Sequence, residues 1–182
     1  MRSVRGTLFV DYVRMLRGRK DVDWSRHLRA EDLAYLRERI APDAWYPMET
    51  FERMGLAILA EITDDVQVAR AWGRAQIDWL CGIHDNLVAP GDPCETLMRF
   101  QVLRRSFFDF SALDIPSIHE GAIDVQVDYG MSARAEEAAA WQTLGFFERL
   151  LEVAGARSVE ARFASTSWTG DLVTTIHLRW QT

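Results

Sequence analysis

The chain has 182 residues, a formal net charge of −6 and 48% hydrophobic residues. This length fits one compact domain with its own core, and the composition is that of a folded globular protein. The acidic balance argues against a protein that binds nucleic acid through its phosphates or docks on an anionic membrane, because both need clustered Lys and Arg.

Six stretches repeat apolar residues every three to four positions, which is typical of helices. Pro47 and Pro93 suit first turns, because a proline lacks the N–H that would be unpaired there. Gly73 costs helix propensity and therefore indicates a close helix–helix contact. The expected helices are 5–17, 29–40, 47–62, 65–80, 93–108 and 132–155.

Alternation of apolar and polar residues replaces the helical period late in the chain. GAIDVQVDYG alternates clearly, and SALDIPSI before it is a weaker strand joined through HEG. SVEARFAST and DLVTTIHLRW form a second hairpin around WTGD. We therefore predict an α+β fold in a single domain, 1–182. An N-terminal helical layer at about 1–108 is followed, at about 109–182, by a four-stranded antiparallel sheet with a long helix inserted between two hairpins.

Cysteine usage and the N-terminal segment favour a cytoplasmic protein. Cys81 and Cys94 are the two cysteines, and no CxxC pair or Cys/His cluster accompanies them. Asp11 and Arg14 interrupt the first apolar run, which therefore differs from a signal peptide. No stretch has the apolar length needed to span a membrane. We expect two free thiols, no metal and no cofactor.

No recognisable catalytic set is present. The histidines are scattered, without the i, i+4 pair of a helical zinc site. Cys81 and His84 stand three residues apart and could act as nucleophile and base or as ligands, but no activating partner or oxyanion site accompanies them. We favour structural roles and predict that the protein is not an enzyme. The histidines are His27, His84, His119 and His177.

The aromatic residues give the best indication of a binding site. Pro47 fixes a helix start, so Trp45 and Tyr46 before it have a set direction. One ring of the pair suffices to pack back onto the first turns of the helix. The other is then free to border a pocket, and Tyr46 is the better candidate because its hydroxyl can reach a polar group.

A wider aromatic cluster supports two interpretations. It is either a packed core or a pocket for a small apolar molecule. On helix 65–80, Trp72, Gln76 and Trp79 form a second stripe beside the apolar one. The candidate ligand-binding residues are Trp45, Tyr46, Trp72, Trp79 and Phe107.

Several motifs together resemble a known family. RGTLFVDYVRML, WYPMETFERMGLAILAEI, ARAWGRAQIDWL and GFFERLLEVAGARSVEARF with WTGDLVTTIHLRW are similar to an uncharacterised paralogous family of myxobacterial proteins. That family is distantly similar to the 4-vinyl-reductase and haem-NO-binding domain superfamily. The resemblance spans Arg5 to Trp180. It implies helices followed by an antiparallel sheet with one inserted helix, and no known activity.

The chain departs from both metal chemistries of that superfamily. Haem-NO-binding domains resemble one another by a Tyr-x-Ser-x-Arg motif that grips the haem propionates. The nearest stretch is YLRER at 35–39, with Arg37 in place of the serine, and no histidine lies inside an expected helix. The final hairpin has none of the cysteines that the vinyl-reductase resemblance implies. We expect neither haem nor another metal.

Two functions follow from these observations. The first is a non-enzymatic sensory or regulatory module that binds a small apolar ligand between the helices and the sheet and reports to a protein partner. The alternative is a protein–protein interaction or dimerisation module without a ligand, acting as a homodimer or through another partner.

Overall fold

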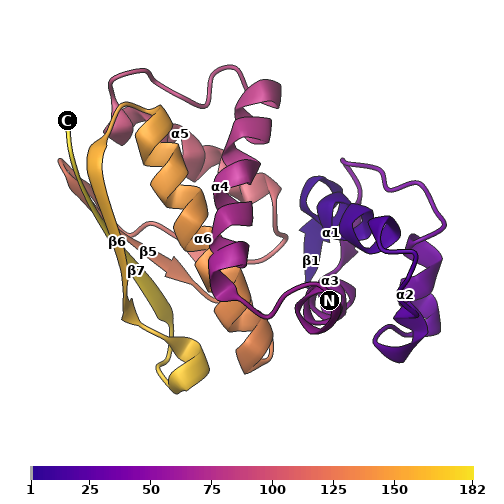
Figure 1. Ribbon diagram of the computed structural model, residues 1–182. Coiled ribbons are helices and arrows are strands. Elements are labelled where there is room, and N and C mark those ends of the chain that lie inside the picture. The colour runs from indigo at the N-terminus through magenta and orange to yellow at the C-terminus, as the bar shows by residue number, and fades with distance from the viewer. Residues whose placement is uncertain (1) are drawn as a thin grey trace. The chain divides into compact units, whose positions relative to one another are not determined.

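The computed structural model describes residues 2–182, which form two compact units. The helical unit comprises residues 2–65 and 105–110, and the sheet unit comprises Val66–Arg104 and Ser111–Thr182 (Figure 1). Two of the helices assigned from the sequence to the helical layer therefore belong with the sheet. The single domain stays a prediction.

The helical unit is built around two packed helices. It contains the elements β1 (Ser3–Arg5), α1 (Gly6–Gly18), η1 (Trp24–Arg26), α2 (Ala30–Tyr35), β2 (Trp45–Pro47) and α3 (Met48–Glu61). Helix α1 buries Phe9, Val13 and Leu16 fully, at the helical spacing that the sequence predicted. These side chains meet the buried face of α3, to which Met54 and Ile58 belong. The core of this unit is thus a two-helix contact.

A buried ion pair ties α2 to α3. Asp32 has no solvent exposure, and its carboxylate accepts two hydrogen bonds of 2.7 Å from the guanidinium of Arg53. Thr50 Oγ1 donates a third bond at 2.7 Å, and the backbone N–H of Arg29 a fourth at 3.0 Å. Each carboxylate oxygen of Asp32 therefore accepts two hydrogen bonds, and these bonds compensate for the cost of removing the charge from water.

Helix α2 is shorter than the predicted helix 29–40. The guanidinium of Arg17 donates hydrogen bonds to the backbone carbonyls of Leu36, Tyr35 and Glu38. A cationic side chain at this position satisfies the carbonyls that a helix end leaves unpaired. The chain after α2 is thus held by a residue of α1.

The sheet unit has the expected α+β architecture. Its elements are α4 (Val66–Ile83), α5 (Pro93–Leu103), β3 (Leu113–Asp114), β4 (Ile118–His119), β5 (Ala122–Val127), α6 (Ala133–Val153), β6 (Arg157–Ser165), η3 (Ser167–Thr169) and β7 (Thr174–Gln181). The division of the chain between the units falls within η2 (Arg104–Ser106). All strand pairs are antiparallel, in the order β3-β5-β7-β6. The sheet has five strands and not four, because the stretch expected as one strand is divided into β3 and β4, with β4 also paired to β5.

One face of the sheet is covered by α6. Ile123 and Val125 of β5 lie opposite Leu178 and Ile176 of β7, and all four are buried. Figure 1 shows α6 lying between the strands and α4. Leu151 of α6 is fully buried as this layering requires. The long helix is therefore covered by the sheet on one side and by α4 of the same unit on the other, and Trp141 on it is half-buried.

At two glycines, the backbones of α4 and α6 are in direct contact. A Cβ added at Gly73 would lie 1.8 Å from the carbonyl oxygen of Gln142, and one at Gly145 would lie 2.0 Å from that of Arg70. Each helix thus places a glycine where the other helix's backbone passes. The close contact predicted from Gly73 is confirmed, and Gly145 is its counterpart on α6.

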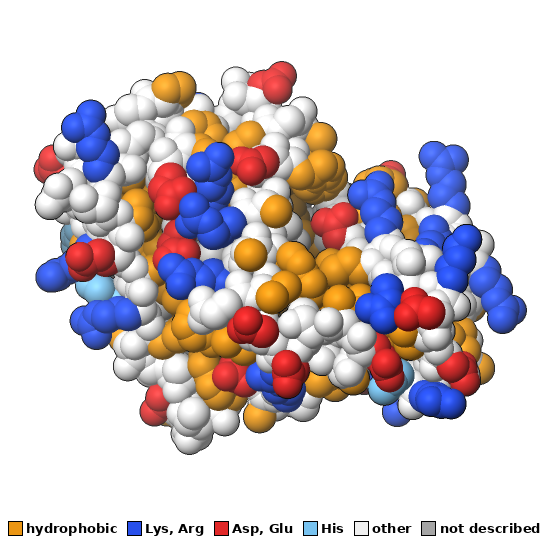
Figure 2. Space-filling model, in the orientation of Figure 1, with side chains coloured by type: hydrophobic (Ala, Val, Ile, Leu, Met, Phe, Trp, Pro, Cys, Tyr) orange, Lys and Arg blue, Asp and Glu red, His pale blue; other side chains and the backbone are white. Residues whose placement is uncertain are grey.

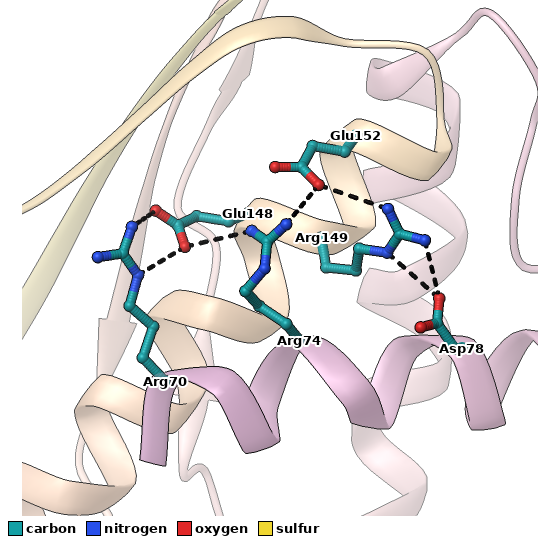
Figure 3. Close-up of polar contacts among 6 residues, drawn as sticks. All are labelled: Arg70, Arg74, Asp78, Glu148, Arg149 and Glu152. Carbon is teal, nitrogen blue, oxygen red and sulfur yellow. Dashed lines mark hydrogen bonds and ion pairs between the residues drawn. The ribbon is translucent and has the colours of Figure 1, made fainter. Parts of the chain in front are cut away.

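A chain of ion pairs runs along the same contact (Figure 3). Arg70 binds the buried Glu148 through two hydrogen bonds of 2.9 and 2.5 Å. Arg74 lies 3.6 Å from Glu148 and 2.7 Å from Glu152. The chain continues through Arg149 of α6, which bonds Asp78 of α4 at 3.1 Å and lies 3.5 Å from Glu152. Three cations and three anions therefore neutralise one another between the two helices.

No helix in the part of the chain that the structure describes has the length and apolar character needed to cross a membrane.

Candidate functional site

The candidate ligand-binding residues are divided between the two units. Trp45, Tyr46 and Phe107 belong to the helical unit, and Trp72 and Trp79 lie on α4 of the sheet unit. Their role in binding stays a prediction.

Strand β1 brings the first three together. Trp45 pairs with Arg5 across the β1–β2 ladder, and Tyr46 pairs with Val4. On the other side of β1, the backbone N–H of Arg5 donates to the carbonyl of Phe107 at 2.8 Å. The Arg5 guanidinium lies 4.6 Å from the centre of the Trp45 ring, within cation–π range. Trp45 and Phe107 therefore flank one short strand.

Tyr46 is held inside the helical unit. Its ring stacks on Phe9 with centroids 4.5 Å apart and meets Tyr35 edge-on at 5.6 Å. Its hydroxyl accepts a hydrogen bond of 2.9 Å from the backbone N–H of Ala41. Trp45, by contrast, is 43% exposed. The structure reverses the expected assignment of the pair, because Tyr46 is the packed ring and Trp45 faces outward.

We expect Tyr46→Ala to lower the free energy of unfolding by about 2–3 kcal/mol, since it removes a stacked, half-buried ring. Trp45→Ala should cost no more than about 1 kcal/mol, roughly the value of an exposed cation–π contact. Tyr46→Phe should cost about 1 kcal/mol, because the N–H of Ala41 loses its acceptor. Urea unfolding of the three variants measures these differences. A larger loss for Trp45→Ala than for Tyr46→Ala would restore the sequence-based assignment.

The resemblance to haem-NO-binding domains implies a haem, and the histidines do not fit one. Haem iron needs an axial ligand such as histidine, held in a fixed position. His27 and His177 are bonded to carboxylates, Glu61 at 2.6 Å and Asp124 at 2.7 Å. The other two are His84, just after α4, and the exposed His119 in β4. None of the four lies inside a helix.

The two cysteines, Cys81 and Cys94, are half-buried free thiols. Burial raises the pKa of the Cys81 thiol, and the neighbouring Asp78 raises it further. Burial also raises the pKa of Cys94, with Asp92 and Glu120 adding to the effect. Both shifts run opposite to the lowered pKa that is typical of reactive cysteines.

The stretch YLRER at 35–39 does not form an anion-binding site. Tyr35 ends α2, and its ring packs edge-on against Phe9 at 5.2 Å. Arg37 and Arg39 are exposed beyond the helix. The tyrosine of this stretch thus packs inside the helical unit, while its two arginines lie at the surface.

A looser version of the motif occurs at 129–134, YGMSAR, with one more residue between tyrosine and serine. That insertion shifts the tyrosine out of the five-residue spacing of the motif. Ser132 precedes α6 and Arg134 lies in its first turn. The Tyr129 hydroxyl shares a 2.6 Å hydrogen bond with Thr143, and Arg134 pairs with Glu137 at 2.8 Å. The tyrosine and the arginine are thus bonded within the protein, and the residues as a set do not fit a histidine-ligated haem.

No cluster of three or more His, Cys, Asp or Glu side chains among residues 2–182 has a geometry that could hold a metal ion.

Comparison with known proteins identifies the fold. No protein-family model and no curated protein matches the chain. Solved structures of H-NOX proteins do match over 98% of it. The S. oneidensis H-NOX in the Fe(II)NO ligation state is 11% identical, with 99% of that chain covered and a TM-score of 0.66. The Fe(II) unliganded H-NOX of K. algicida is 10% identical, with 97% covered and a TM-score of 0.67. A mutant of the T. Tengcongensis H-NOX is 13% identical, with 98% covered and a TM-score of 0.62. The chain therefore has the α+β fold of the H-NOX proteins.

Proposed function

We propose that this chain is a non-enzymatic sensory module that uses the H-NOX fold without a histidine-ligated haem. The proposal rests on one observation, which is that the chain has the H-NOX fold but no histidine inside a helix that could bind haem iron. The fold extends over 98% of the chain, while all four histidines lie outside helices and two are bonded to carboxylates. A cytoplasmic location and a kinship with the myxobacterial family belong to the same proposal.

The ligand that we propose is a small molecule of low polarity. The S. oneidensis protein is described with NO on its Fe(II), and NO is such a molecule. Sites for small apolar ligands are lined by aromatic side chains with a few polar groups. Trp45, Tyr46, Trp72, Trp79 and Phe107 remain the candidates for this role. Occupancy would be reported to a protein partner.

A second function is favoured by one observation. Trp79 is 39% exposed and Ile83 is 49% exposed, one turn apart on α4. Large apolar side chains that gather on a surface mark interaction sites. A dimerisation module without a ligand would need such a surface.

The purified protein is expected to be colourless, with no Soret band and far less than one haem per chain in a pyridine haemochromogen assay. The physical reason is the lack of an axial ligand described above. Expression with added haem precursor is the appropriate condition, because it removes haem supply as a cause of a low content. One haem per chain, with a Soret band that shifts in His84→Ala, would contradict the proposal, since His84 is the histidine adjoining a helix.

Native mass spectrometry of freshly purified protein tests the sensory function. A reproducible adduct of a few hundred daltons or less per chain, removed by denaturation, would support a ligand-binding module. We expect Trp45→Ala or Trp72→Ala to reduce its occupancy, whereas Leu172→Ala at an exposed loop position should not. A chain without adduct that responds to no apolar small molecule in thermal melts would favour the dimerisation module.

A further inference from the structure

The charged side chains of α4 are all engaged with α6, including that of Asp78, which is exposed at the edge of the contact. The charged residues of this helix are Arg70, Arg74 and Asp78, and all three are paired with residues of α6. Figure 2 shows acidic and basic side chains gathered along the line between α6 and α4, with hydrophobic side chains over α4 itself. A helix that is apolar beyond its buried stripe is normally covered on that side as well.

Six residues form this outward face, and their sizes alternate. Trp79 and Ile83 are exposed and Trp72 is half-buried, so three large side chains reach the surface. Beside them stand three small exposed residues. The six are Ala71, Trp72, Ala75, Trp79, Gly82 and Ile83, and we call them the α4 face.

The positions of the α4 face are spaced symmetrically along the helix. Its positions are symmetric about residue 77, so an antiparallel copy would bring each position opposite its mirror position. Trp72 then lies opposite Gly82, Trp79 opposite Ala75, and Ile83 opposite Ala71. Each large side chain therefore meets a small one, which is the arrangement that lets facing helices interdigitate. Because the axis is two-fold, each of these three pairs occurs twice in the interface.

We propose that a second copy of this chain covers the α4 face, with the two α4 helices antiparallel about a two-fold axis near residue 77. Charge favours this occupant. Two chains of net charge −6 repel each other over most of their surfaces, but not where both are uncharged. Gln76 lies close to the axis, and its amide can both donate and accept, so two copies can bond each other. The inference develops the homodimer considered above, and its failure would leave the sensory function untouched.

Sedimentation velocity over a range of concentrations tests the dimer. We expect wild type to form dimers, and Ile83→Glu to weaken dimerisation at least tenfold by placing two carboxylates in the interface. Met98→Glu is the matched control, because Met98 of α5 is 48% exposed and Ile83 is 49% exposed. The control should dimerise like wild type. A wild-type chain that stays monomeric at every concentration, or equal weakening by both variants, would overturn the proposal.

Cross-linking tests the antiparallel register. In a Cys81→Ser, Cys94→Ser background, Ala75→Cys places two thiols about 6 Å apart along the axis, given a rise of 1.5 Å per residue. Gly82→Cys places them about 15 Å apart by the same count. A short bis-maleimide should join the first pair and not the second. Parallel packing would join both, and packing through another surface would join neither, so either result refutes the register.

Discussion

Gly73→Ala is expected to lower the free energy of unfolding by about 3 kcal/mol or more, at the upper end of the range for overpacked cores. The added methyl group would lie 1.8 Å from the carbonyl oxygen of Gln142 and 2.9 Å from the backbone nitrogen of Phe146. No rotamer change relieves such a clash, because the opposing atoms are backbone. The helices α4 and α6 must therefore separate, which also stretches the ion pairs between them.

Gly82→Ala is the control for this substitution, with both variants compared at a concentration at which the chain is monomeric. Gly82 lies in the last turn of the same helix, and a Cβ there meets nothing within 4 Å. Alanine should therefore stabilise the chain by about 0.5–1 kcal/mol, the difference in helix propensity. The two substitutions are chemically identical and should differ in sign in chemical denaturation. A neutral result for Gly73→Ala would mean that α4 and α6 are further apart than described.

Asp32→Asn is expected to cost about 3–5 kcal/mol at pH 7, the usual result of removing one partner of a buried ion pair. The substitution leaves the guanidinium of Arg53, which is largely buried, without its carboxylate. Glu31→Gln next to it removes an exposed carboxylate and should change stability by less than about 0.5 kcal/mol. Equal effects of the two would show that Asp32 is solvated.

The effect of Asp32→Asn should depend on pH in a defined direction. Burial by itself would raise the pKa of Asp32, but hydrogen bonds from Arg53, Thr50 and the Arg29 N–H outweigh it and hold the pKa below its usual range. A carboxyl whose pKa is lower in the folded state adds stability above its unfolded pKa of about 3.9 and loses it as the pH falls through the folded value. The difference in the free energy of unfolding between wild type and Asp32→Asn is therefore largest at neutral pH and should decrease below about pH 4.

The sequence predicts those features that depend on periodicity along one element. The apolar repeats of α1, α3, α4 and α6 place these helices correctly, since each buries one face whatever its partner is. Gly73 signals its close contact because glycine has no other advantage inside a helix. Features that depend on a distant residue were missed. The three-residue strand β2 exists because β1 pairs with it, and the short α2 ends where Arg17 reaches its carbonyls.

The same distinction applies to the candidate site. That aromatic residues gather in this chain is visible in its composition, but which ring is exposed depends on packing. Tyr46 is held by Phe9 and by the N–H of Ala41, neither of which its own neighbours reveal. On α4, the stripe of Trp72 and Trp79 was visible as a helical pattern. The sequence does not reveal that the charged residues of α4, which are Arg70, Arg74 and Asp78, all pair with α6 and not with another partner.

The backbone contact at Gly73 and Gly145 has a mechanical consequence. Where side chains separate two helices, a change of rotamer can take up part of a small movement. At the two glycines the backbones of α4 and α6 meet directly, so no change of rotamer can relieve a closer approach at those points. We therefore expect a movement of α6 toward α4 to displace α4 as well. A partner that covers the exposed Trp79 of α4 would then be moved together with this helix.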